Sequence, residues 1–170
     1  MRGRGKRVAT WAGVLAFGVV GLAALLCWPP PQPRFLRSRE EVLVRAEIFR
    51  ALASKTPDVE VRYVAFGTAE QKYMDPSPEE FAEFLKALGD SNNRVKRASE
   101  FHGTLEDMAR WRGPPSAFYV IEIKQWVAGI AVRASGDVVQ GPLSGWGADI
   151  ELKKVSGKWV VSQMDLTHYF

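Results

Sequence analysis

The chain has 170 residues, of which 23 are Lys or Arg and 19 are Asp or Glu, and its formal net charge is +4. Five of the basic residues precede residue 35 while every acidic residue follows it, so residues 35–170 carry 18 basic and 19 acidic side chains. This balance excludes the strongly basic surface of a nucleic-acid-binding domain, and we expect no nucleic-acid partner. A single cysteine, Cys27, excludes an intrachain disulfide.

An uncharged apolar segment, Val8–Trp28, follows a basic tail at residues 1–7. A helix of its 21 residues, rising about 1.5 Å per residue, just crosses a hydrocarbon core of roughly 30 Å. We therefore predict a transmembrane signal anchor at residues 8–28, which makes the membrane a partner. The basic residues before it predict a cytoplasmic N-terminus and an extracytoplasmic remainder. Cleavage as a signal peptide and the inverted topology are the alternatives.

A proline-rich linker at residues 29–37 follows the anchor. Proline lacks an amide donor and restricts the residue before it, so this stretch is either a stiff spacer or simply the end of the membrane helix. The sequence S-R-E-E at residues 38–41 has the pattern of a capping box, which predicts a helix from Ser38 to about residue 54. Its apolar residues at helical spacing are Val42, Ala46, Ile48, Phe49, Leu52 and Ala53.

The next segments predict a strand, a second helix and a short strand. Residues 59–66 first alternate and then become apolar, as in a strand of a sheet that is covered on one side. Residues 94–99 predict the short strand. Between the two strands, a second capping box and a glycine suited to a left-handed terminus delimit the helix. These cap residues are Ser77, Pro78, Glu80 and Gly89.

The C-terminal part predicts a loop followed by strands. Residues 100–116 have no regular period and contain several Gly and Pro, so we expect a loop there. Residues 117–126 and 127–134 predict strands, either separate or continuous through a bend at Gly129. A turn is expected at residues 135–137.

The last hairpin is predicted in most detail, around a two-residue turn at Ser156-Gly157. In this register Val155 faces Lys158, Lys154 faces Trp159 and Leu152 faces Val161. One face of the hairpin then carries a set of apolar side chains, and the pairing agrees with the expected burial. These side chains are Ala148, Ile150, Leu152, Trp159 and Val161.

Together these segments predict an α+β fold. We expect an N-terminal transmembrane helix followed by one domain, residues 38–170, in which two to three helices pack on a curved antiparallel sheet. A chain segment of this length is sufficient for one domain with a modest core. The predicted order is a basic tail, an anchor, a linker and this extracytoplasmic domain.

Two features carry a resemblance to known proteins. The helix, strand and meander order, with the ending L-K-K-x-x-G-K-W-V-V at residues 152–161, resembles the NTF2-like and cystatin-like folds. Residues 61–100, with D-P-S-P-E-E-F and V-K-R-A-S-E, are similar to a family of uncharacterised bacterial exported proteins. The resemblance implies an exported domain at the bacterial inner (cytoplasmic) membrane and implies no catalytic residues.

The residues that support chemistry are few. Two histidines and one cysteine exclude a Cys- or His-rich zinc site, so we expect no metal and no cofactor. A mixed site built from loop carboxylates and a histidine is less expected than a solvated polar loop; its residues are Glu100, His102, Glu106 and Asp107. No G-x-S-x-G pattern or phosphate-binding glycine loop is present in the sequence. No catalytic residue is predicted.

Aromatic residues in glycine-rich stretches provide the only candidate binding site. Trp111, with Arg112 beside it, and Trp146 lie where we expect loops, and an exposed tryptophan beside arginine is suited to anchoring a partner. Rings folded back as loop plugs are the simpler interpretation. We therefore predict a membrane-anchored, non-enzymatic binding or assembly module with a protein partner at the cell envelope. The alternative is an NTF2-like enzyme or small-ligand carrier with a pocket in the concave sheet.

Overall fold

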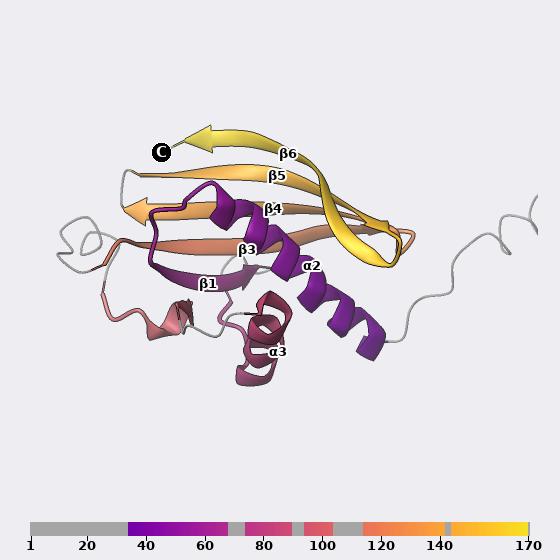
Figure 1. Cartoon of the computed structure of the whole chain (residues 1–170), viewed down its shortest axis with the longest axis horizontal. Coiled ribbons are helices and arrows are strands. Elements are labelled where there is room, and N and C mark those ends of the chain that lie inside the picture. Colours follow the sequence, from indigo (N-terminus) through magenta and orange to yellow (C-terminus); the bar gives the residue numbers. More distant parts are fainter. Residues whose placement is uncertain (1–33, 68–73, 90–93, 104–113, 142–143, 170) are drawn as a thin grey trace, which may run out of the picture. The chain divides into compact units, whose positions relative to one another are not determined.

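The described residues of the computed structural model build one six-stranded sheet with helices packed against it (Figure 1). The structure describes residues 34–67, 74–89, 94–103, 114–141 and 144–169. The strand order across the sheet is β2-β1-β3-β4-β5-β6. The strands are β1 Val61–Gly67, β2 Val95–Arg97, β3 Ser116–Val127, β4 Ala131–Gly141, β5 Ser144–Val155 and β6 Lys158–Tyr169; the helices are α2 Arg34–Ser54, α3 Pro78–Leu88 and the 3₁₀ turn η1 Ala98–Glu100.

The sheet is mixed, and this corrects the predicted antiparallel sheet. β1 pairs in parallel with both of its neighbours, β2 and β3, whereas β3 to β6 are antiparallel. Parallel neighbours cannot be joined by a tight turn, and α3 lies in the connection from β1 to β2. The sequence pattern of β1 indicates a strand but contains nothing about the direction of its partners, which is why the prediction was wrong.

The predicted transmembrane helix is also not part of the described fold. Among the described residues there are two α-helices, and neither is long and apolar enough to cross a membrane. The segment Val8–Trp28 lies outside the described residues, as does most of the linker at residues 29–37. The anchor and the localisation derived from it therefore stay predictions from the sequence.

The helix α2 covers one face of the sheet, packing on β3, β4 and β6 (Figure 1). It begins at Arg34, so Ser38 lies inside the helix and the predicted cap at Ser38 was wrong. The predicted apolar stripe is buried or half-buried, and Leu52 is fully buried. At Gly136 a Cβ atom would lie 2.6 Å from Leu52 Cδ1, so the missing side chain of this glycine makes room for the helix.

The helix α3 begins and ends as its sequence indicates. Ser77 accepts a hydrogen bond from the Glu80 amide at 3.2 Å, and the Glu80 carboxylate accepts one from the Ser77 amide at 3.1 Å. Gly89 ends the helix in the left-handed region with φ 69°. Phe84 is fully buried, and its ring packs edge-on against Phe66 of β1 with centroids 5.3 Å apart. The capping box therefore places the apolar stripe of α3 against the β1 edge of the core.

The C-terminal strands form consecutive hairpins. The predicted turn at Ser156-Gly157 is confirmed, both residues have positive φ, and all three expected pairs are present. The β3–β4 turn comprises residues 128–130, where Ala128 and Gly129 have positive φ, so these two segments are separate strands. The expected turn at residues 135–137 was wrong because these residues lie inside β4, where Gly136 is required beneath α2.

Candidate functional site

Of the three sequence-predicted binding residues, the structure describes only Trp146. Trp111 and Arg112 lie outside the described residues. Trp146 lies in β5 rather than in a loop, and its half-buried ring packs against the hydrophobic core. The interpretation of Trp146 as a ring folded into the protein is therefore the one that fits its position.

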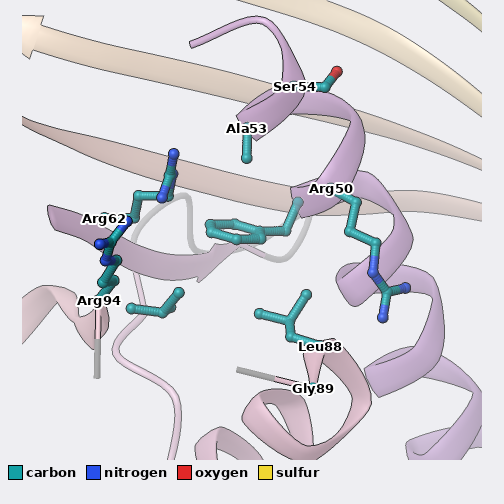
Figure 2. A pocket seen from close by; sticks show the side chains of 9 residues that line it. Arg50, Ala53, Ser54, Arg62, Leu88, Gly89 and Arg94 are labelled. Carbon is teal, nitrogen blue, oxygen red and sulfur yellow. The ribbon is translucent and has the colours of Figure 1, made fainter. Parts of the chain in front are cut away.

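A groove on the helix side of the sheet offers a different candidate. It lies where the C-terminal ends of α2 and α3 meet the first residues of β1 and β2, and its volume is about 420 Å³ (Figure 2). The lining residues that the structure describes include three arginines, Arg50, Arg62 and Arg94, and no acidic residue. Its apolar lining residues are Phe49, Ala53, Leu88 and Val95. The groove therefore combines positive charge with an apolar surface.

The apolar floor of the groove is part of the core. The Phe49 ring is buried and packs against Phe84 and Tyr119, with ring centroids 5.6 and 5.1 Å apart. Tyr119 is fully buried and shares a 2.6 Å hydrogen bond with the Thr56 hydroxyl. Close packing on several sides holds these rings in place, so the floor is preformed.

The side chain of Arg50 already has bonding partners within the protein. Its guanidinium pairs with Glu47 on the same helix and donates a hydrogen bond to the carbonyl of Ala87 near the end of α3. The C-terminal end of a helix carries partial negative charge on its free carbonyls, and a cation there is stabilising. Arg50 therefore has a structural role, which joins α2 to α3.

Arg62 and Arg94 differ from Arg50 in having no such partner. Among the described residues, neither side chain makes an ion pair or a hydrogen bond, and the Nε atom of Arg62 is buried without an acceptor. The two residues are neighbours, because the Arg62 amide donates a 2.9 Å hydrogen bond to the Arg94 carbonyl. Figure 2 shows both side chains on one side of the groove, with Leu88 and Gly89 on the other.

The chemistry that this arrangement supports is anion binding. A guanidinium presents up to five N–H donors in a planar fork that fits the oxygens of a carboxylate or phosphate. It stays charged in proteins and accepts no proton near neutral pH, so it supplies attraction rather than acid–base catalysis. A buried donor without an acceptor is unfavourable unless a ligand satisfies it.

Sequence reasoning missed this groove because its basic residues come from α2, from β1 and from the position just before β2, which are far apart along the chain. They share no spacing that a motif search detects. One signal was present in β1. Alternate residues of a strand point to the same face of the sheet, so Arg62 shares a face with Val64 and Phe66, which are buried. A charged residue at an apolar position of a strand indicates either a strand end or a site.

The motifs behind the family resemblance have structural roles in the described fold. The Asp75 carboxylate accepts hydrogen bonds from the amide and the hydroxyl of Ser99, at 2.9 and 2.7 Å. Arg97 lies 3.6 Å from the same carboxylate. The D-P-S-P-E-E-F and V-K-R-A-S-E segments therefore contact each other and fix the start of α3 beside η1. They hold the chain at the β2 edge, where Arg94 lies.

The histidines and the loop carboxylates form no metal site in the described part of the chain. His102 is exposed, and Glu106 and Asp107 lie outside the described residues. His168 Nε2 lies 3.8 Å from Asp137 Oδ1, across Gly147, where a Cβ atom would be 2.1 Å from the His168 ring. This contact links three neighbouring strands, and we interpret it as structural.

Comparison of the chain with protein-family models, with curated proteins and with solved structures found no match. The resemblance to NTF2-like and cystatin-like folds and to bacterial exported proteins stays a prediction from the motifs.

Proposed function

We propose that the domain is a non-enzymatic binding module and that the groove at Arg62 and Arg94 receives an oxyanion. The observation that carries this proposal is that Arg62 and Arg94, which are neighbours through a backbone hydrogen bond, both line the groove and have no acidic partner among the described residues. Both arginines lie beside an apolar floor that is preformed by packing in the core. Such preorganisation lowers the entropic cost of binding.

The composition of the groove supports binding over catalysis. Among the described residues that line it there is no carboxylate, imidazole or thiol, which are the groups that usually transfer protons or attack a substrate. The alternative, an NTF2-like pocket in the concave sheet, finds less support in the packing. The centre of the α2–sheet interface is occupied by Phe49, Leu52 and Tyr119.

The location of the module stays a prediction. The apolar segment Val8–Trp28 and the basic tail before it favour attachment to a bacterial inner membrane with the domain on the extracytoplasmic side. A protein partner at the cell envelope that presents an acidic side chain or terminus is one source of the anion. The groove itself is the part of this proposal that an experiment addresses directly.

Titration of the full chain with inorganic phosphate at constant ionic strength, followed by amide NMR, tests the proposal. We expect saturable shifts at Gly89, Arg94 and Val95, which are not reproduced by chloride. The double substitution Arg62→Gln and Arg94→Gln should weaken this binding about tenfold or more, because two charge-assisted contacts are lost.

The matched control is Arg133→Gln. Arg133 is an exposed arginine of β4 that pairs with Glu151 at 3.3 Å, so its loss should leave phosphate binding unchanged. Unsaturable shifts, or equal weakening by Arg133→Gln and by the double substitution, would mean that the groove is not an anion site.

A further inference from the structure

We infer that the anion bound in the groove is the head of a single-chain amphiphile, an inference that depends on the proposed function. The oxyanion head, a carboxylate or a phosphate, contacts Arg62 and Arg94. The unbranched apolar chain lies along Phe49 and Leu88.

The distribution of side chains in the groove carries this inference. The arginines without partners occupy one side, whereas Leu88 lies on the opposite side and Ala53 on a third (Figure 2). The floor between them is made by Phe49 and Val95, which are 5 % and 7 % exposed. If the arginines bind the head of a ligand, the rest of that ligand extends across the groove and contacts apolar side chains.

The size of the groove favours an anion that carries an apolar chain over a bare inorganic ion. A volume of about 420 Å³ lies in the usual range for small-molecule sites, roughly 300–1,000 Å³. The half-buried side chains of Ala53 and Leu88 keep apolar surface in contact with water when a bare inorganic ion is bound. Each methylene of a chain that lies along these side chains removes apolar surface from water and tightens binding.

Charge complementarity also separates an amphiphile from a neutral apolar ligand. The hydroxyl of an alcohol offers the arginines a single neutral oxygen. A carboxylate on a chain of the same length offers two oxygens that share a negative charge, and these form stronger charge-assisted hydrogen bonds with a guanidinium. The site therefore distinguishes ligands by their head group as well as by their chain.

The test is a calorimetric titration of the full chain with acetate, hexanoate, octanoate, decanoate and decanol. We expect affinity to rise with each pair of methylenes, so that decanoate binds about a hundredfold tighter than acetate. Decanol should bind about tenfold or more weakly than decanoate. This chain-length series needs no substitution and does not depend on a variant that folds.

Two variants locate the chain in the groove. Leu88→Gln should weaken decanoate binding several-fold while leaving phosphate binding unchanged. Val160→Gln replaces an exposed apolar residue of β6, 47 % exposed, and should leave both unchanged. Thermal unfolding of Leu88→Gln verifies that it is folded.

Vesicles distinguish two sources of the same chemistry. Displacement of decanoate by phosphatidylcholine vesicles that carry lysophosphatidylglycerol, a single-chain anionic lipid, but not by vesicles of phosphatidylcholine alone, would support a lipid of the bilayer as the source. Failure of both to displace it would support a free amphiphile.

Two results overturn the inference. If phosphate binds at Arg62 and Arg94 but decanoate binds no more tightly than acetate, the amphiphile is wrong while the anion-binding function stands. If no anion binds the groove, both the inference and the proposed function fail.

Discussion

The two halves of the sheet are held together in different ways. From β3 to β6, strands of 11 or 12 residues pair with their sequence neighbours through three consecutive antiparallel ladders. At the other edge, β2 has 3 residues and pairs in parallel with β1, which has 7. Side-chain bonds such as Asp75 to Ser99 supplement this short ladder. The groove lies at this less extensively bonded edge.

The antiparallel strands β3 to β6 therefore contribute most to the stability of the fold, whereas the β1–β2 edge provides the candidate site. Local opening is easiest where few backbone hydrogen bonds and few buried contacts must break. Binding surfaces are often drawn from such regions, since a ligand there supplies contacts that the protein lacks. The following predictions test whether the two regions differ in this way, in order of decreasing effect.

The largest effect is expected where α2 meets the antiparallel strands. Leu52→Ala should destabilise the protein by about 2–5 kcal/mol, because a fully buried side chain is lost and a cavity remains. Gly136→Ala should cost about 1–3 kcal/mol, because its new Cβ meets Leu52 Cδ1 at 2.6 Å. Urea unfolding of both variants and of the double variant measures the coupling.

In the double variant the smaller side chain at position 52 leaves room for the new methyl group. The loss of stability should therefore be less than the sum of the two single losses. Strict additivity would mean that α2 does not rest on Gly136 as described.

A smaller effect is expected at the parallel edge. Asp75→Ala removes both hydrogen bonds to Ser99 and should destabilise the protein by about 1–2 kcal/mol. Hydrogen exchange of the Ser99 amide should become faster, and phosphate binding at the groove should weaken because Arg94 loses part of its support. The control is Asp149→Ala, which breaks an exposed pair with Lys124 at 2.7 Å and should cost at most about 1 kcal/mol.

The two readouts separate local from global effects. If exchange at Ser99 is unchanged in Asp75→Ala, the carboxylate is not the acceptor of that amide. If exchange in β4 and β5 accelerates as much as at Ser99, the edge is no less stable than the antiparallel strands.

The smallest effect is expected from Glu40, which joins α2 to the last hairpin. Its carboxylate accepts a 2.8 Å hydrogen bond from Lys154 and another from the Trp159 indole. Burial alone raises the pKa of Glu40, but these hydrogen bonds, together with the charges of Lys154 and Arg39, outweigh it and lower the pKa below its ordinary value of 4.5.

A carboxylate with a lowered pKa stabilises the fold above its unfolded pKa, and this stabilisation is lost as the pH falls through the folded pKa. Wild type should therefore be more stable than Glu40→Gln at pH 7, and the difference should shrink as the pH falls below about 4.5. Urea unfolding at pH 7 and at pH 3.5 measures it. A difference that grows on acidification would contradict the lowered pKa.

Much of the local structure is predictable from the sequence, and particular residues show why. The hairpin at Ser156-Gly157 has a turn that favours one register, and its apolar face agrees with that register, so two independent constraints coincide. The caps of α3 are equally local, because Ser77 and Glu80 satisfy each other within one turn. The start of α2 shows the limit, since a capping pattern at Ser38 occurs inside a longer helix.

The candidate site was less predictable than the fold. The tryptophan interpretation selected residues by type and by expected loops, and Trp146 lies instead in β5 against the core. Arg62 and Arg94 are separated by the whole of α3 along the chain and become neighbours only when β2 pairs with β1. No spacing in a single stretch of sequence encodes that proximity.

By itself the sequence determined the charge balance of residues 35–170, the caps of α3, the apolar face of α2 and the register of the last hairpin. Each of these depends on residues that are near one another in the chain or on composition. Only the tertiary structure decided the parallel pairing of β1, the place of Gly136 beneath Leu52 and the meeting of Arg62 with Arg94. The reason is that parallel pairing and groove formation depend on contacts between distant segments, which residue patterns within one segment do not specify.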